Sequence, residues 1–127
     1  MLILVVDDSA MMREYVGGVL KEAGFEIIEA PDGQAALEIL RGRSDIKCII
    51  CDVHMPLMDG VELVEEISKL PSPPPVVMHT TESKSQLVHR ALAAGVAGWV
   101  QKPCKPHLLV AAARKLTGTT VRHDAPR

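Results

Sequence analysis

The sequence predicts an α/β protein: a single (βα)5 domain built on a doubly wound, five-stranded parallel sheet. Five short apolar runs alternate with five stretches whose apolar residues recur at helical spacing. The middle run, residues 47–53, is apolar on both faces, which is typical of a central strand in a parallel sheet. The chain has 127 residues, enough for one core without metal or disulfide support.

The first two strand–helix units follow from local signals. Residues 2–6, LILVV, form a buried strand; Asp8 or Ser9 can cap the next helix, which ends near Gly24. Residues 25–30, FEIIEA, form a shorter strand with interspersed glutamates, so we place it at an edge of the sheet. Pro31 then opens the second helix, at a position where proline is tolerated.

The remaining units come after the central strand. A third helix is expected to end before the stiff segment 71–75, PSPPP. Residues 76–81 form the fourth strand, and a helix over 84–94 ends near Gly95. Residues 98–101 form the last strand, and Pro106 lies near the start of the closing helix. The apolar set of the fourth helix is Leu87, Val88, Ala91 and Leu92. The domain is assigned to residues 1–116, and residues 117–127 to a disordered tail.

Composition argues against several classes of protein. The formal charge of −2 gives no reason to expect nucleic acid or an anionic membrane as partner. The first apolar run stops at Asp7, far short of the ~20 residues of a membrane span, and it lacks the features of a signal peptide. Together with three cysteines, an odd and small number, this favours a cytoplasmic, reducing location.

Cys48 and Cys51 form a C-x-x-C motif, which could indicate a redox or zinc site. Residues three apart on a strand point to opposite faces, so these two thiols cannot close on each other or on one metal. We interpret both as small buried residues.

Four charged residues lie where predicted strands end. Asp7 and Asp8 follow the first strand, Asp52 the third and Lys102 the fifth. Parallel sheets bind ligands at the carboxyl ends of their strands, so these groups are expected to meet in one pocket. Carboxylates ~4 Å apart repel by about 4 kcal/mol per pair at an effective dielectric near 20, so the cluster calls for a cation.

These motifs resemble the receiver domain of two-component response regulators. The resemblance rests on DD after the first strand, DVHMPLMDG around the third, HTTE at the end of the fourth and KP after the fifth. It covers residues 2–116, and the chain is most similar to the stand-alone chemotaxis type because little follows that stretch. The resemblance implies the flavodoxin-like strand order 2-1-3-4-5, which is adopted from known folds that include a chemotaxis regulator.

For the site, the resemblance implies that Asp52 accepts a phosphoryl group from a sensor histidine kinase or phosphotransfer protein. Asp7, Asp8, Asp52 and the main-chain carbonyl of His54 would hold Mg²⁺, with Mn²⁺ as an alternative ion. Lys102 would pair with a phosphoryl oxygen.

The resemblance also implies a switch. Thr80 would donate its hydroxyl to the phosphoryl group, and Trp99, at the switch-aromatic position, would turn inward. The face made by helix four, strand five and helix five would then change shape and regulate a target protein. The bond between Lys102 and Pro103 is expected to be cis.

A rim of three residues, His54, Thr81 and Glu82, is expected to tune the lifetime of the phosphate. His54, Thr81 and Cys104 differ from the residues common at these positions in the family. His54 could orient the attacking water or lie in solvent, and the sequence leaves both open.

The protein is therefore interpreted as a signalling switch, not an enzyme, apart from catalysing its own phosphorylation and dephosphorylation. A non-phosphorylated interaction module and an aspartate-nucleophile phosphatase are the alternatives; such phosphatases usually carry Asp where this chain has His54. A nucleotide binder is less favoured because no Gly-rich turn follows the first strand. A monomer or a weak phosphorylation-dependent dimer is expected. Motor regulator, phosphate sink and phosphorelay intermediate all stay open, as does loss of an output domain.

Overall fold

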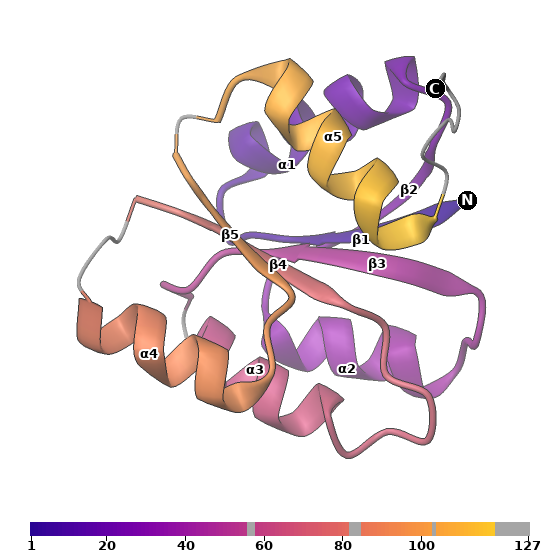
Figure 1. Ribbon diagram of the computed structural model, residues 1–127. Helices are drawn as coiled ribbons and strands as arrows, with labels where there is room; N and C mark the ends of the chain where they lie inside the picture. The colour runs from indigo at the N-terminus through magenta and orange to yellow at the C-terminus, as the bar shows by residue number, and fades with distance from the viewer. Residues whose placement is uncertain (56–57, 82–84, 103, 119–127) are drawn as a thin grey trace.

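The computed structural model describes residues 1–55, 58–81, 85–102 and 104–118. Strands and helices alternate along the whole of this chain (Figure 1). The elements are β1 (Leu2–Val6), α1 (Ala10–Glu22), β2 (Glu26–Ala30), α2 (Gly33–Arg41), β3 (Ile46–Cys51), α3 (Gly60–Ile67), β4 (Val76–Thr80), α4 (Ser85–Ala94), β5 (Gly98–Gln101) and α5 (Pro106–Thr117). The predicted (βα)5 order is confirmed.

The five strands form one parallel sheet in the order β2-β1-β3-β4-β5. Figure 1 shows α1 and α5 on one face of the sheet and α2, α3 and α4 on the other. The predicted fold class and strand order are therefore confirmed. The glutamate-containing strand β2 lies at an edge, as its sequence indicated.

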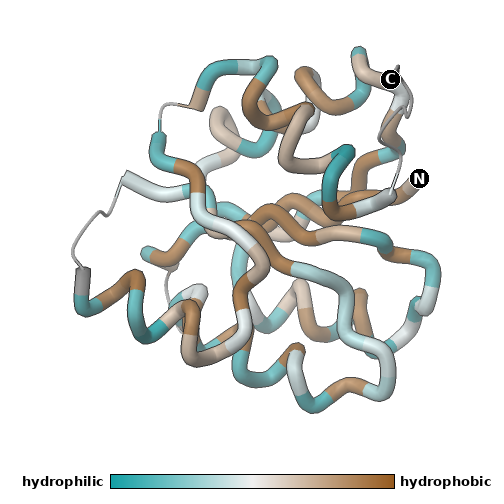
Figure 2. Tube along the Cα trace, viewed as in Figure 1, coloured by the Kyte–Doolittle hydropathy of each residue, from teal (hydrophilic) through white to brown (hydrophobic). Residues whose placement is uncertain are grey.

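The sheet separates two apolar cores. A larger core lies between the sheet and α2, α3 and α4, and a smaller one lies between the sheet and α1 and α5. Strand β1 supplies both, because Leu4 faces the larger core and its neighbours Ile3 and Val5 face the smaller one. In Figure 2 the strands are apolar through the middle of the molecule. Each fully buried side chain of this size stabilises the fold by about 1.5–3 kcal/mol.

The cysteines are buried and divided between the two cores. Cys48 contributes to the smaller core and Cys51 to the larger one, so their thiols lie on opposite faces of the sheet, as predicted. Burial raises the pKa of both thiols, to about 12 for Cys48. Both side chains therefore act as small apolar residues.

Two local predictions were wrong. Pro31 precedes α2 instead of opening it, because Asp32 is the N-cap and its carboxylate accepts from the Ala35 amide at 2.8 Å. Leu92 is 54% exposed, although the spacing of apolar residues placed it inward. Among the residues of α4 whose burial is described, Ala91 is the fully buried one, and Leu92 lies one position further round the helix.

The end of the chain also differs from the prediction. Helix α5 includes Thr117, which was assigned to the tail, and Gly118 ends it in a left-handed conformation with φ 74°. The rest of the predicted tail, residues 119–127, lies outside the described residues. So do Glu82 and Pro103, and with Pro103 the predicted cis bond. Within the described parts of the chain, no helix is both long and apolar enough to cross a membrane.

Candidate functional site

The register of the sheet brings polar residues of three strands together at one end. Val6, the residue before Asp7, pairs with Cys51, the residue before Asp52. Cys51 in turn pairs with Met78, the residue before His79. Asp7, Asp52 and His79 therefore follow one another across β1, β3 and β4. By strand alternation they lie on the face covered by α1 and α5.

The three aspartates form a compact acidic cluster. Asp7, Asp8 and Asp52 each offer a carboxylate oxygen, and these oxygens lie within 4.8 Å of one another. Asp7 and Asp52 are 3% and 7% exposed, whereas Asp8 is open to solvent. The structure thus brings together the carboxylates that the sequence placed at the ends of two strands.

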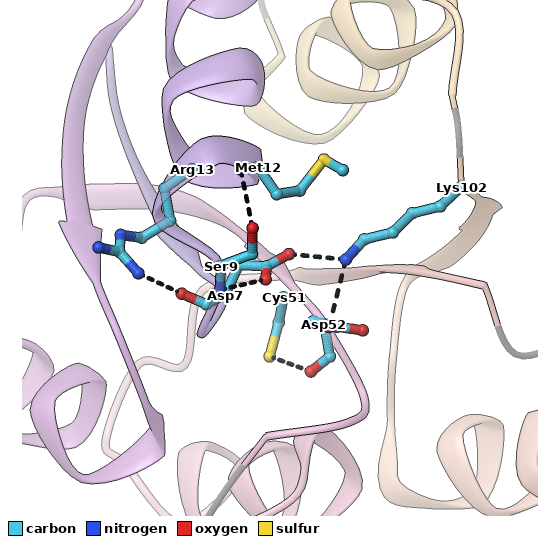
Figure 3. Close-up of polar contacts among 7 residues, drawn as sticks. All are labelled: Asp7, Ser9, Met12, Arg13, Cys51, Asp52 and Lys102. Carbon is cyan, nitrogen blue, oxygen red and sulfur yellow. Dashed lines mark hydrogen bonds and ion pairs between the residues drawn. The ribbon is translucent and has the colours of Figure 1, made fainter.

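Lys102 supplies the positive charge of the site. Its Nζ lies 2.8 Å from Oδ2 of Asp7 and 3.2 Å from Oδ2 of Asp52 (Figure 3). Burial by itself lowers the pKa of the Lys102 ammonium, but the hydrogen bonds and negative charges of Asp7 and Asp52 outweigh it and the pKa is raised. The lysine is therefore a fixed cation between two buried carboxylates.

Helix α1 holds the acidic side of the site. The Ser9 amide donates to Oδ1 of Asp7 at 3.0 Å, and Nη1 of Arg13 donates to the main-chain oxygen of Asp7 at 2.6 Å (Figure 3). Arg13 also pairs with Glu29 at the end of β2, with 3.1 Å between Nε and Oε1. Our sequence reasoning did not include Arg13. The signal was a basic residue early in the first helix, matched by a glutamate at the end of the neighbouring strand.

The backbone after Asp52 is held by the start of α3. The Gly60 amide donates to the Val53 carbonyl at 2.8 Å, so α3 begins directly against the segment that carries Asp52. A Cβ on Gly60 would contact the main-chain oxygen of Asp52 and would lie 2.6 Å from Cε of Met78. A side chain at this position would therefore displace the segment that carries Asp52.

His79 is a further neighbour of the site that sequence reasoning missed. It is 2% exposed, and its Nε2 has no hydrogen-bond partner among the described residues. Burial lowers the pKa of the imidazole and the Lys102 charge adds to this effect, while Asp7 and Asp52 oppose it. The side chain is therefore neutral at pH 7. Strand alternation from Asp52 to its neighbour in β4 could have identified it.

The other predicted site residues lie around this centre. Thr80 is fully buried at the end of β4, and its carbonyl accepts from the Lys102 amide at 2.8 Å. Trp99 is half-buried on β5 and packs against the larger core. His54 and Thr81 are exposed near the ends of β3 and β4. The structure thus places Thr80 beside Lys102. Trp99 lies on β5, three residues before Lys102.

The donor set of the cluster suits a hard divalent cation. Carboxylate oxygens are the ligands that Mg²⁺ accepts, and Mg²⁺ usually keeps several of its waters. Asp8 lies at the solvent-exposed side of the cluster, where a bound ion would keep its waters. Asp7 and Asp52 provide negative charge at the buried side. The residues present therefore fit Mg²⁺.

Comparison with known proteins gives a consistent result. The response regulator receiver domain family matches residues 3–114. A chemotaxis protein CheY homologue of Campylobacter jejuni is 37% identical over 122 residues, covering 94% of each chain. Chemotaxis protein CheY1 of Helicobacter pylori is also 37% identical, over 94% of this chain and 98% of its own.

Solved structures agree at the level of the fold. The crystal structure of Vibrio cholerae chemotaxis protein CheY4 superposes with a TM-score of 0.82 at 34% identity. The similarity covers 91% of this chain and 97% of that one. The match therefore covers most of the fold.

Proposed function

Because this chain belongs to the response regulator receiver domain family, we propose that it is a phosphorylatable switch of a two-component phosphorelay, with Asp52 as phosphoacceptor. One observation carries the assignment of the residue. Lys102 binds Asp52 and Asp7 together, and Asp8 completes an acidic cluster open to solvent on one side. The names of the relatives support a role in chemotaxis.

In the proposed reaction, a carboxylate oxygen of Asp52 attacks the phosphorus of a phosphohistidine on the donor protein. The P–O bond forms as the P–N bond breaks, and the released imidazole takes up a proton. Phosphoryl transfer depends mainly on positioning and on stabilising charge on the phosphoryl oxygens. Lys102, whose Nζ lies 3.2 Å from the Asp52 carboxylate, would supply that charge.

Asp7, Asp8 and Asp52 are the residues that would hold Mg²⁺, with Mn²⁺ as an alternative ion. The main-chain carbonyl of His54 is proposed as a further ligand. When bound, the ion neutralises carboxylate and phosphoryl charge. Asp7 is held by its bonds from Ser9 and Arg13, and Asp8 lies on the solvent side of the cluster.

Phosphorylation adds about −1.5 to −2 charges and three acceptor oxygens beside Thr80 and Lys102. The proposed switch is a shift of Thr80 toward the phosphoryl group, followed by an inward turn of Trp99. The target protein would then bind the face of α4, β5 and α5, where Leu92 already offers an exposed apolar side chain. His54, Thr81 and Glu82 would set the lifetime of the phosphate.

The proposed partners are a sensor histidine kinase or phosphotransfer protein and a downstream target, in the cytoplasm. Receivers of this family are signalling proteins rather than metabolic enzymes. The protein is proposed to act as a monomer or as a weak dimer that depends on phosphorylation.

The test is intact-mass spectrometry after incubation with Mg²⁺ and acetyl phosphate, together with the fluorescence of the sole tryptophan, Trp99. We expect one added phosphoryl group and a fluorescence change, both lost without Mg²⁺ and in Asp52→Asn. Asp45→Asn, an exposed aspartate away from the site, is the matched control and should behave like the unsubstituted protein. Absence of phosphorylation at Asp52 would falsify the proposal, and release of phosphate over many turnovers would favour a phosphatase instead.

A further inference from the structure

A tyrosine on α1 contacts the chain segment that carries Lys102. The Tyr15 hydroxyl donates to the main-chain oxygen of Cys104 at 2.9 Å, joining residues that are 89 positions apart in the sequence. Cys104 lies in the connection between β5 and α5, two residues after Lys102. Lys102 is the first residue of this connection, so the path of the connection bears on where the lysine ammonium lies.

Few other contacts hold the described residues of this connection. The Lys102 amide donates to the Thr80 carbonyl, which fixes the end next to β5. At the other end, Lys105 is the N-cap of α5; it has no side-chain cap bond among the described residues, and its carbonyl accepts from the Leu108 and Leu109 amides at 3.0 and 3.2 Å. Between these ends, Cys104 buries its thiol in the smaller core and gives its carbonyl to Tyr15. Among the described residues, Tyr15 and the smaller core are therefore the two contacts that hold Cys104 in place.

The same helix also holds the acidic half of the site. Ser9, at the start of α1, and Arg13, one turn later, donate to Asp7. Tyr15 follows Arg13 by two residues and contacts the connection that carries Lys102. Helix α1 thus joins the segment that carries Asp7 and Asp8 to the segment that carries Lys102.

We propose that Tyr15 is a positioning residue for phosphoryl transfer: through the Cys104 carbonyl it holds the Lys102 ammonium at Asp7 and Asp52. This inference rests on the proposed function of Asp52. A hydroxyl-to-carbonyl bond of ordinary strength corresponds to about a 2- to 10-fold effect on a rate that depends on it. Small displacements of charged groups at such sites lower rates, because the reaction depends on positioning.

The experiment compares the rate of Asp52 phosphorylation by acetyl phosphate in the unsubstituted protein and in Tyr15→Phe, which keeps the ring and removes only the hydroxyl. We expect the rate to fall by about 2- to 10-fold, with the Mg²⁺ affinity changed by less than about 2-fold, because the acidic half keeps its own contacts. Ser68→Ala is the matched control. It removes a hydroxyl-to-carbonyl bond of 2.7 Å at the end of α3 and should leave the rate unchanged.

A double-mutant cycle with Lys102→Ala separates positioning from a general structural role. If Tyr15 acts through Lys102, Tyr15→Phe has no further effect on the residual rate in the Lys102→Ala background. An equal loss in both backgrounds, or no loss in either, overturns the inference.

A second readout does not depend on phosphorylation. Hydrogen exchange at the Lys102 amide, which is bonded to Thr80, should become faster in Tyr15→Phe and not in Ser68→Ala. If the unsubstituted protein accepts no phosphate, the proposed function fails, and this exchange measurement alone judges the positional role of Tyr15. Unchanged exchange in that case overturns the inference as well.

Discussion

Lys102 is the single residue on which the charge balance of the site depends most. It is 11% exposed and contacts Asp7 and Asp52, both of which are more deeply buried. Removal of one partner from a buried ion pair costs about 3–5 kcal/mol, because the remaining charges stay buried without compensation. The open side of this site reduces that cost.

Without Mg²⁺, we expect Lys102→Met to lower the free energy of unfolding by roughly 2–4 kcal/mol. Adding Mg²⁺ should then raise the free energy of unfolding by more in this variant than in the unsubstituted protein. Urea unfolding with and without the ion measures both quantities. Lys69→Met is the matched control, since its pair with Glu66 is exposed and should change stability by only about 0.5 kcal/mol. Equal losses in the two variants would contradict this reading of the site.

His79 predicts a dependence of stability on pH. Its pKa is lowered in the folded protein, so the folded state resists protonation while the unfolded state, with an ordinary value near 6.5, accepts it. The contribution of the neutral imidazole is therefore present above pH ~6.5 and is lost as the pH falls, by at most about 1.4 kcal/mol per pH unit. His79→Val should flatten the fall in unfolding free energy between about pH 6.5 and 5.

The measurement is urea unfolding across that pH range. His107→Gln is the control, because His107 is exposed on α5 and lacks this burial. If His79→Val and His107→Gln gave the same pH profile as the unsubstituted protein, the acid sensitivity would have to come from other groups.

At the level of elements, the start of α3 sets the position of the segment after β3. Asp59 and Glu62 form a capping box, with bonds of 2.8 Å and 3.1 Å, that fixes where the helix begins. Gly60 then lets the first turn approach the Asp52 carbonyl. Helix α3 therefore supports the segment that carries the proposed phosphoacceptor.

We expect Gly60→Ala to destabilise the protein by about 2 kcal/mol or more, since the added methyl meets backbone that cannot move cheaply. The rate of Asp52 phosphorylation should fall as well. Gly18→Ala is the matched control: its Cβ meets nothing within 4 Å, it lies in α1, and it should stabilise by about 0.5–1 kcal/mol. Thermal unfolding of the two variants tests whether Gly60→Ala lowers the stability and Gly18→Ala raises it.

For the whole molecule, the acidic cluster links folding to metal binding. An ion that binds only the folded state stabilises it by about 2.7 kcal/mol at a concentration of 100 Kd. We expect Mg²⁺ to raise the thermal midpoint of the unsubstituted protein. Asp8→Asn should lose much of this gain without losing stability in chelator, because Asp8 is exposed and its charge adds to the repulsion. Asp45→Asn should keep the gain, and loss of the gain there would point to nonspecific binding.

Sequence analysis could predict the fold and the centre of the site, because strand ends are visible as the points where apolar runs stop. Asp7, Asp52 and Lys102 were found in this way, and the structure brings them into contact. The strand order could not be derived from periodicity and was adopted from known folds.

The misses have a common physical cause. The contacts of Arg13 and Tyr15 depend on how α1 is rotated over the sheet and on the path of a distant connection. The exposure of Leu92 depends on how α4 rests on the sheet. None of these is encoded in the spacing of residues along one helix.

The long separation between the charged groups also bears on how the protein is made. Lys102 pairs with carboxylates that lie 95 and 50 positions earlier in the chain. A ribosome produces the amino-terminal part first, so the three aspartates emerge well before the lysine that balances them. Until β5 is added, the aspartates lack the lysine that pairs with two of them in the folded protein. The ion pairs of Lys102 can therefore form only after most of the domain has been made.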